Sequence, residues 1–402
     1  MTFQAKRRVD YWLGGLLLAL LFPAVRILGR LLKRDHTLDQ RRGCVVIKMV
    51  GAGSLFLAMP SLQAIRGTFP PGRFILIGTS GVTSFADAHD WFDERWTIDD
   101  RSFWRLLLSI LRVLPKMAMH ADHLIDLEVH SRFTTILGIL SMVRNRIGFV
   151  DEIVFWRRGF YTHMTYFNVH GPVYAFYDLL AGWFGIEQVP VSDFHAAYRR
   201  RVLRENLPAG LLAKRYVTIG HACSEFGQER QLLPSEWLRV LEVHLRAGLT
   251  PVFLGGQGDA AHAGRIIAVL GSGLNLCGRL SIAQSARAIA GAEEFLGIDS
   301  LLLHLARALG VPSFSAWGPT DPATRLRPIT TPERVAFVRL PCAPCIHVNE
   351  APPCGGRRTC MAVAVEALVR PANTEPGVRK TTIGWDIDPS APNVRPVSID
   401  YA

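Results

Sequence analysis

Residues 291–328 constrain the fold more than any other segment, because they read as two short strands joined by one helix. An apolar run ends at Asp299-Ser300, a nine-residue helical pattern follows, and a Gly and a Pro precede a second strand at 313–317. Asp or Ser directly before a helix is a typical N-cap. A strand that leads into a helix N-terminus directs free backbone N–H groups at one point, where they bind anions. The segment therefore predicts half of a phosphate- or nucleotide-binding site.

Strand and helix patterns alternate through most of the chain, which is typical of doubly wound α/β domains. The alternation begins with the apolar run 44–50 and begins again at 216–219, after a charged helical stretch at 198–212 that we interpret as a connection. A chain of 402 residues is long enough for two domains. We expect a basic and apolar segment at 1–40, an N-terminal Rossmann-like domain at 41–205, a C-terminal Rossmann-like domain at 206–370, and an extended tail at 371–402.

The first 42 residues carry nine basic and three acidic side chains, and so supply +6 of the net charge of +11. Residues 11–25 are uncharged and rich in Leu, but they span only roughly 22 Å of a ~30 Å hydrocarbon core, and Pro23 interrupts them. Beyond Pro23, apolar and basic residues alternate at helical spacing. This pattern predicts an amphipathic helix that lies in an anionic membrane interface. A helix packed on the protein, a signal peptide and a true span are the alternatives, although no small-residue cleavage site follows.

Composition excludes some classes of protein. The chain is 49% apolar and 20% charged, which is typical of a globular protein and not of a disordered one. The basic residues are concentrated at the N-terminus, which favours an anionic surface over a nucleic-acid groove, and no nucleic-acid-binding motif is present. An NAD-type oxidoreductase is disfavoured, because no G-x-G-x-x-G is followed by an acidic residue about twenty positions later.

Two glycine-rich turns follow strand patterns, one in each half: Gly51-x-Gly53 and Gly255-Gly256. Either one alone is most simply a tight turn that needs positive φ. Together they favour ligand binding, because open α/β sheets bind ligands at the carboxyl ends of their strands. His304 follows Asp299 by about one helical turn, so we expect it to face the same site, with an ordinary helix histidine as the alternative.

Five blocks of the sequence, in this order, resemble glycosyltransferase family 9, the ADP-heptose:lipopolysaccharide heptosyltransferases and their relatives. The last two blocks are the most specific, with Asp-Ser, then His-Leu-Ala, then Ala-Leu-Gly-x-Pro, then Gly-Pro-Thr-Asp-Pro. The blocks are VVIKMVGAGSLFLAMPSLQAIRGTFP (45–70), YVTIGHACSEFGQERQLLPSEWLRVL (216–241), PVFLGGQGD (251–259), LCGRLSIAQSARAIAGAEEFLGIDSLLLHLARALGVP (276–312) and WGPTDP (317–322).

The resemblance implies an α/β fold of the GT-B type, with two Rossmann-like doubly wound domains that face each other across a cleft. The N-terminal domain would hold the acceptor and the C-terminal domain a nucleotide-sugar, and transfer would be inverting and independent of metal. The family's basic residue before a Trp-Pro pair corresponds best to Arg230. The candidate substrate-binding residues are Gly51, Gly53, Asp299, Ser300, His304, Gly318 and Thr320.

The chain departs from the family pattern at two positions. The family usually has Asp in the first turn as its general base, where this chain has Ser54, and a serine hydroxyl does not titrate near pH 7. Glu128 and His130 are candidate replacements. Leu301 replaces the usual Gly after Asp-Ser and would narrow the donor-sugar pocket, so ADP-heptose need not be the donor. The catalytic candidates are therefore Ser54, Glu128 and Arg230.

Four of the seven cysteines form a C-x2-C-x8-C-x5-C pattern: Cys342, Cys345, Cys354 and Cys360. Four thiolates at this spacing are candidates for a structural Zn²⁺ or iron–sulfur site, although the spacing fits no standard finger. The alternative is a loop with unpaired or redox-labile thiols. We expect no cofactor in catalysis.

Taken together, the residues and the resemblance predict an inverting glycosyltransferase that moves heptose or a related sugar. The expected donor is ADP-heptose or a similar nucleotide-sugar, and the expected acceptor is a lipid-linked envelope glycan such as lipopolysaccharide. We expect a peripheral protein on the cytoplasmic face of the inner membrane, in contact with an anionic membrane surface and not with nucleic acid. The alternative is a catalytically inactive family member that binds glycan or nucleotide-sugar, because Ser54 replaces the usual base.

Overall fold

A computed structural model describes residues 3–39, 41–208, 210–211, 215–223, 227–346, 352 and 354–369. The tail expected at 371–402 lies outside the described residues. The chain divides into two compact units, with the division between Val191 and Ser192. The sequence placed this division near residue 205. Each unit contains one six-stranded sheet in which all strands are parallel.

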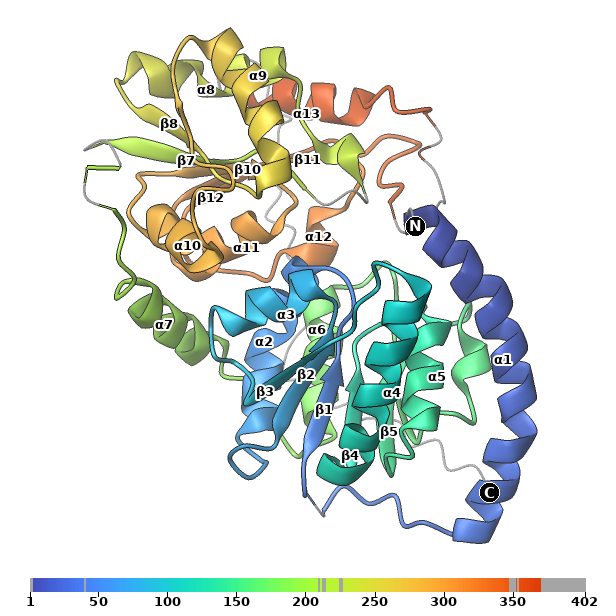
Figure 1. Ribbon diagram of the computed structural model, residues 1–402. Coiled ribbons are helices and arrows are strands. Elements are labelled where there is room, and N and C mark those ends of the chain that lie inside the picture. Colours follow the sequence, from blue (N-terminus) through green and yellow to red (C-terminus); the bar gives the residue numbers. More distant parts are fainter. Residues whose placement is uncertain are drawn as a thin grey trace. The chain divides into compact units, whose positions relative to one another are not determined.

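The N-terminal sheet has the strand order β3-β2-β1-β4-β5-β6 (Figure 1). The central strand β1 is buried along its whole length, and Ile47 lies opposite Ile77 on one side and Asp126 on the other. Parallel strands covered on both faces read as continuous apolar runs, which is why the sequence marks them clearly. The strands are β1 Cys44–Ile47, β2 Phe74–Gly78, β3 Glu94–Thr97, β4 His123–Asp126, β5 Asn145–Val150 and β6 His163–Tyr166.

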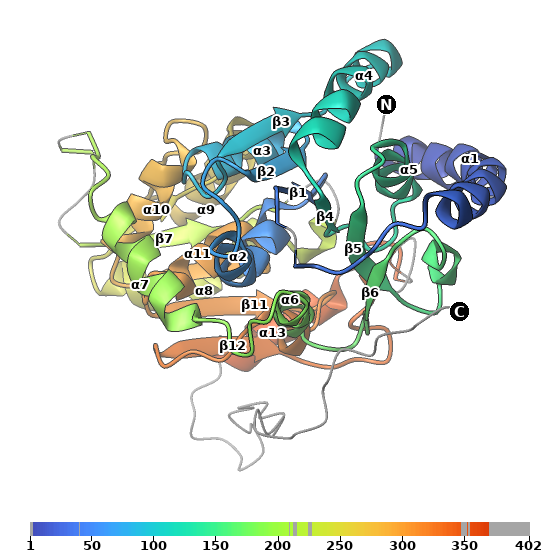
Figure 2. The same ribbon diagram turned by 90° about the horizontal axis from the view of Figure 1, so that it is seen from below.

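Helices cover both faces of this sheet. Figure 2 shows α4 and α5 on one face and α2 and α6 on the other, and α2 packs against α3 and α6 while α4 packs against α5. The turn between β1 and α2 begins at Gly51, whose φ of 89° suits a residue without Cβ. The helices are α2 Ala52–Arg66, α3 Ser80–Asp87, α4 Phe103–His120, α5 Arg132–Leu140, the short η1 Phe155–Arg157, and α6 Val173–Gly182.

Helix α1 (Phe3–Leu32) is continuous through Pro23, so the expected interruption is wrong. A proline inside a helix removes one backbone hydrogen bond. Here the packing of α1 along α5, where Leu18 is buried, holds the turns on both sides of Pro23 together. The stretch 7–32 contains an 18-residue window with a mean hydropathy of 1.9 and is long and apolar enough, by length and composition, to cross a membrane. The uncharged run noted at 11–25 lies inside this stretch.

The C-terminal sheet has the order β12-β11-β10-β7-β8-β9. Helix α7 begins and ends earlier than the stretch 198–212 predicts, because Pro208 follows closely and cannot continue a helix. The strands are β7 Tyr216–Gly220, β8 Thr250–Phe253, β9 Leu274–Asn275, β10 Phe295–Ile298, β11 Ser313–Trp317 and β12 Glu333–Phe337. The helices are α7 Val191–Val202, η2 Gln228–Arg230, α8 Pro234–Arg246, η3 Gln257–Asp259, α9 Ala260–Leu270, α10 Ile282–Ala290, α11 Leu301–Ala308, α12 Pro322–Arg325 and α13 Thr359–Val369.

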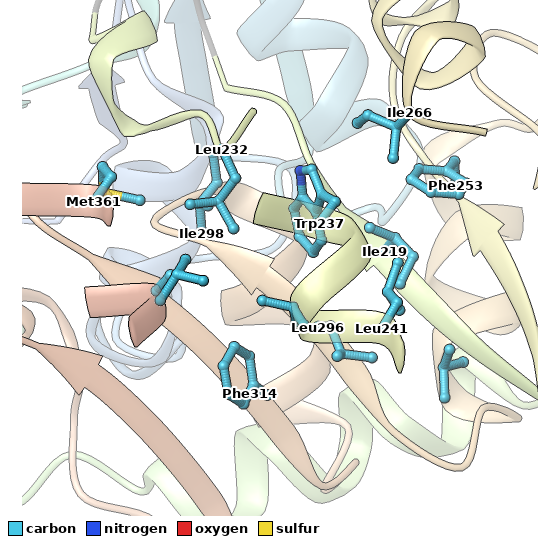
Figure 3. Packing of buried hydrophobic residues seen from close by; sticks show 14 of the residues in the cluster. Ile219, Leu232, Trp237, Leu241, Phe253, Ile266, Leu296, Ile298, Phe314 and Met361 are labelled. Carbon is cyan, nitrogen blue, oxygen red and sulfur yellow. The ribbon is translucent and has the colours of Figure 1, made fainter. Parts of the chain in front are cut away.

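The core of the C-terminal unit surrounds Trp237 of α8, which is fully buried (Figure 3). Strands β7, β8, β10 and β11 contribute apolar side chains from one side, and Met361 of α13 packs from another. Because α13 packs on α8, β11 and β12, the helix that carries Cys360, the last cysteine of the pattern, belongs to the same core as the strands that lead to the predicted binding site.

Candidate functional site

The carboxyl ends of the central strands in the C-terminal sheet bring most of the predicted site residues together. Asp299 and Ser300 follow β10, Thr320 follows the neighbouring strand β11, and Arg230 lies in η2 after β7, the other neighbour of β10. Since all these strands are parallel, their carboxyl ends meet at one edge of the sheet. The strand order thus explains how residues up to ninety positions apart share one place.

Arg230 and Asp299 form a nearly buried ion pair. Arg230 Nη1 donates to Asp299 Oδ2 at 3.0 Å and to the Asp299 carbonyl oxygen at 2.8 Å. The two side chains are only 13% and 9% exposed. Burial alone would raise the pKa of Asp299, but Arg230, followed by Arg325 and His304, lowers it below its ordinary value. The carboxylate therefore stays ionised in the interior and fixes the guanidinium beside the start of α11.

Two buried polar atoms beside this pair have no hydrogen-bond partner within the described residues: Ser300 Oγ and His304 Nδ1. The Thr320 hydroxyl lies against the Asp299 carboxylate and helps to lower its pKa. Ser300 is the N-cap residue of α11, but its hydroxyl does not cap the helix. The Asp299 carboxylate pairs with Arg230 instead. Of the two residues expected as N-cap, Ser300 therefore occupies that position, but without the side-chain hydrogen bond. Buried polar groups are normally paired. Two unpaired atoms beside an uncapped helix N-terminus are the arrangement expected of a site that a polar ligand completes.

His304 is buried and keeps a neutral imidazole. Burial is the main reason that its pKa falls from 6.5 to about 4, and the Asp299 carboxylate, 3.8 Å from Nε2, only partly opposes the shift. A neutral imidazole can donate with one nitrogen and accept with the other. His304 is therefore suited to hydrogen bonding at neutral pH and not to supplying positive charge.

Gly318 and Gly255 have structural reasons to be glycine. A Cβ on Gly318 would lie 2.8 Å from Cys360 Sγ and 2.8 Å from the Met361 sulfur, so α13 approaches this turn too closely for any side chain. A Cβ on Gly255 would lie 2.7 Å from Asp259 Oδ2. The expected positive φ is found at Gly51 alone among the four glycines of the two predicted turns. Gly53 lies in the first turn of α2.

The corresponding edge of the N-terminal sheet holds Glu128, just after β4. Its Oε1 accepts hydrogen bonds from Lys48 Nζ at 3.1 Å, Met49 N at 2.7 Å and Val50 N at 3.0 Å. Its backbone N–H donates to Asp126 Oδ1 at 2.9 Å. Oε2 accepts no hydrogen bond from the part of the chain that the structure describes, and the side chain is 18% exposed. Glu128 thus holds the loop after β1 with one oxygen and leaves the other available.

Ser54 and His130 lie near this edge. Ser54 lies in the first turn of α2, and its hydroxyl donates to the Gly51 carbonyl oxygen at 2.8 Å, directly after the loop that Glu128 holds. His130 Nδ1 is 3.8 Å from Asp151 Oδ2, and burial is the main cause that lowers its pKa. Within the C-terminal unit the structure brings Arg230, Asp299, Ser300, His304 and Thr320 together, and in the N-terminal unit it places Gly51, Ser54 and Glu128 at one loop.

Sequence reasoning missed several charged residues at these edges. Lys48 is 5% exposed and follows β1; burial opposes its charged form, but Glu128 keeps its pKa above the ordinary value. Asp126 and Arg157 form a fully buried pair at 2.9 Å beneath Glu128. His221, directly after β7, is buried, and burial lowers its pKa to about 4. A charged or imidazole side chain at the end of an apolar strand run was the signal that could have found Lys48, Asp126 and His221.

The four cysteines of the pattern differ in how far they are buried. Cys345 and Cys360 are buried, Cys354 is half-buried and Cys342 is exposed, and all are free thiols. Burial, with smaller contributions from the other three thiols, raises the pKa of Cys345 to about 11. Within the described residues no three His, Cys, Asp or Glu side chains are arranged to hold a metal ion. A metal at these cysteines therefore stays a prediction.

Comparison with known proteins agrees with this geometry. The sequence model of glycosyltransferase family 9 (heptosyltransferase) matches residues 162–354, which include the whole strand region of the C-terminal unit. A stretch of 96 residues is 38% identical to lipopolysaccharide heptosyltransferase 1 of Pseudomonas aeruginosa. That stretch covers 23% of this chain and only 25% of the relative.

Solved structures show the same fold at low sequence identity. A glycosyltransferase family 9 protein of Veillonella parvula superposes with a TM-score of 0.59 at 16% identity, covering 75% of this chain and 87% of its own. The Escherichia coli heptosyltransferase WaaC with ADP gives 0.58 at 16% identity, and E. coli ADP-heptose LPS heptosyltransferase II gives 0.57 at 15% identity. Each of these two covers 81% of this chain and 98% of its own. The chain thus has two parallel α/β sheets and the fold of these GT-B-like neighbours.

Proposed function

We propose that this chain transfers a sugar from a nucleotide-sugar to a lipid-linked glycan of the cell envelope. The chain belongs to glycosyltransferase family 9, a family of heptosyltransferase-like glycosyltransferases. The proposed donor is ADP-heptose or a close analogue, and the proposed acceptor is of the lipopolysaccharide type. The family match and the relatives described above are all glycosyltransferases, and none of them supports the non-catalytic alternative.

One observation carries the donor site: beside the Arg230–Asp299 pair lie two buried polar atoms without partners in the described residues, Ser300 Oγ and His304 Nδ1. A sugar diphosphate has oxygens that accept hydrogen bonds from Ser300, Thr320 and the first N–H groups of α11, which have no partner inside the helix. Arg230 adds a fixed positive charge. These groups offer what a diphosphate needs at the moment its bond to the sugar breaks.

We propose an inverting displacement. A base takes the proton of the acceptor hydroxyl while its oxygen attacks the anomeric carbon from the face opposite the nucleotide. The bond from that carbon to the diphosphate oxygen breaks, and the nucleoside diphosphate leaves with the electron pair. Glu128 is the base we favour, because Ser54 does not titrate in this range and Oε2 of Glu128 is unoccupied within the described residues.

No metal ion is required in this proposal, since Arg230 and the N-terminus of α11 can stabilise the leaving diphosphate. Any Zn²⁺ or iron–sulfur cluster at Cys342, Cys345, Cys354 and Cys360 would be structural, because these thiols lie around the start of α13 and Gly318, where they can join the loop to the core. Metal analysis of the purified protein tests that part separately from activity.

We propose that α1 lies flat in the cytoplasmic leaflet of the inner membrane. Asp10 accepts the backbone N–H groups of Arg132 at 3.0 Å and Phe133 at 2.6 Å, at the start of α5. A Cβ on Gly14 would lie 2.7 Å from the Arg132 side chain, so the two helices touch closely. These contacts favour a helix fixed along the N-terminal unit over one that leaves it to cross the bilayer. A helix held in this way would bring the acceptor's lipid end near the unit that we expect to bind it.

Thermal unfolding with a panel of nucleotide-sugars tests the donor site. A ligand that binds only the folded protein raises the melting temperature by mass action. We expect one nucleotide-sugar to raise it in the wild type and to lose that effect in Ser300→Ala and Thr320→Val, whereas Thr68→Val, at a hydroxyl that donates to Ile65 O in the N-terminal unit, keeps it. Incubation with that donor and a lipid-linked envelope extract then gives a transferred product that Glu128→Gln abolishes. No response to any nucleotide-sugar would refute the proposal.

A further inference from the structure

The outward face of α4 is apolar, although the helix covers a sheet and its inner face is already buried. Ser109, Val113 and Met117 are buried against the sheet, as expected for a helix in this position. On the opposite side Trp104, Leu108, Leu111, Pro115 and Met119 are spaced four, three, four and four residues apart, so they lie along one line. Trp104 is 71% exposed and Leu111 58%. A helix at the surface of a soluble protein normally has polar residues on this side.

The charges of α4 are all positive. The helix contains no Asp or Glu, and the exposed Arg105, Arg112 and Lys116 follow one edge of the apolar line. Arg112 makes no ion pair with any described residue. An apolar line bordered by cations, with Trp at one end, is typical of helices that lie in the interface of anionic membranes.

Helix α4 lies on the same face of the N-terminal sheet as α1, with α5 between them (Figures 1 and 2). Helix α1 also exposes large apolar side chains, including Trp12 at 76% and Leu20 at 65%. Both helices pack against α5 within one compact unit. Two neighbouring helices on one face of the N-terminal unit therefore carry exposed apolar and basic residues, so both could contact the same membrane surface.

We propose that α4 is a second membrane-contacting helix, which inserts Trp104, Leu108, Leu111 and Met119 into the surface of an anionic phospholipid bilayer while Arg105, Arg112 and Lys116 contact the headgroups. A second copy of the chain fits this face less well. A symmetric dimer places the same patch of each copy against the other, and here that would bring the cations of both α4 helices together without any acidic partner from the helix. The inference deepens the membrane part of the proposed function, but does not depend on the sugar-transfer reaction.

Vesicle flotation of the full-length protein tests this inference, with α1 intact in every variant. The vesicles are phosphatidylcholine alone or mixed with phosphatidylglycerol. We expect Leu108→Glu/Leu111→Glu to weaken partitioning to the mixed vesicles roughly tenfold or more, because two exposed apolar side chains leave the bilayer and two negative charges approach it. The matched control is Val243→Glu/Val269→Glu, which changes two similarly exposed apolar residues of α8 and α9 in the other unit and should partition like the wild type. Arg112→Gln/Lys116→Gln should weaken binding to the mixed vesicles only.

A second measurement keeps the α4 face intact. Brominated phospholipid should quench less of the tryptophan fluorescence in Trp104→Phe than in the wild type, because Trp104 is the only Trp of this helix. Equal flotation of the α4 variant and its control, or equal quenching, would overturn the proposal. A dimer in light scattering that the α4 variant dissociates would assign the face to a second copy instead. The donor-induced rise in melting temperature is read without lipid, so failure of the sugar-transfer proposal and failure of this one are distinguishable.

Discussion

The Arg230–Asp299 pair should be worth several kcal/mol to the C-terminal unit, which a double-mutant cycle can measure. At 3.0 Å and an effective dielectric constant of about 20, the attraction of two unit charges is roughly 5 kcal/mol before desolvation. Removing one partner of a buried pair leaves the other charge uncompensated and typically costs about 3–5 kcal/mol. We therefore expect Arg230→Met and Asp299→Asn each to lower the free energy of unfolding by about 3 kcal/mol. The double variant should lose about 2 kcal/mol less than the sum.

Urea unfolding at pH 7, followed by far-UV circular dichroism, is the assay. With a slope of roughly 1–3 kcal/mol/M, each single variant moves the midpoint by about 1 M or more. Arg246→Met is the control, because Arg246 pairs with Glu242 at 2.6 Å but the side chains are 75% and 51% exposed; it should cost about 0.5 kcal/mol or less. If the two single changes add to within about 0.5 kcal/mol, the atoms do not interact as described and the reasoning is refuted.

Three further predictions concern pH, packing and helix docking. The pKa of His304 in the folded protein, about 4, lies below the ordinary 6.5, so the unfolded chain binds the proton first as the pH falls. The free energy of unfolding therefore decreases between pH 6.5 and pH 4, by about 3 kcal/mol at most. Denaturation midpoints across this range should depend less on pH in His304→Gln than in the wild type, and an unchanged dependence would contradict the assignment. Gly318→Ala should lower the free energy of unfolding in urea by about 1–3 kcal/mol, because the new Cβ meets Cys360. The control is Gly264→Ala in α9, whose new Cβ has no atom within 4 Å and should leave stability unchanged or raise it. Asp10→Ala should lower the free energy of unfolding by about 1–2 kcal/mol and increase amide hydrogen exchange at the start of α5, where Asp10 accepts hydrogen bonds from two backbone N–H groups. Unchanged exchange there would show that these contacts do not form.

The sequence was sufficient for most of the fold. The strand at 313–317 coincides with β11, and the strand pattern at 216–219 lies within β7. Short, fully buried strands between helices leave clear apolar runs bounded by turns. The uninterrupted length of helix α1 was underestimated, because Pro23 is a strong local signal for the end of a helix. The packing of α5 on α1 outweighs this signal, but α5 is distant in the sequence, so the residues around Pro23 do not reveal it.

The candidate site was predictable in position and less so in its interactions. The strand and helix pattern placed Asp299 and Ser300 at a helix N-terminus, and the family resemblance added Thr320 in the following turn. The pairing of Arg230 with Asp299 joins residues 69 positions apart and follows no periodicity. In the same way, the three donors that converge on Glu128 Oε1 come from a loop about 80 residues earlier. Two of them are backbone N–H groups, which side-chain identity does not reveal.

The contact between Asp10 and α5 has a consequence for how the chain is made. The two partners are 122 residues apart, so at roughly 5–20 residues per second a ribosome needs about 6–24 s to make the second after the first. During that interval the apolar helix α1 has been synthesised, but α5, against which it later packs, has not. A bilayer or a chaperone is the natural temporary host. Delivery to the lipid would then begin during synthesis, well before the remainder of the N-terminal unit exists.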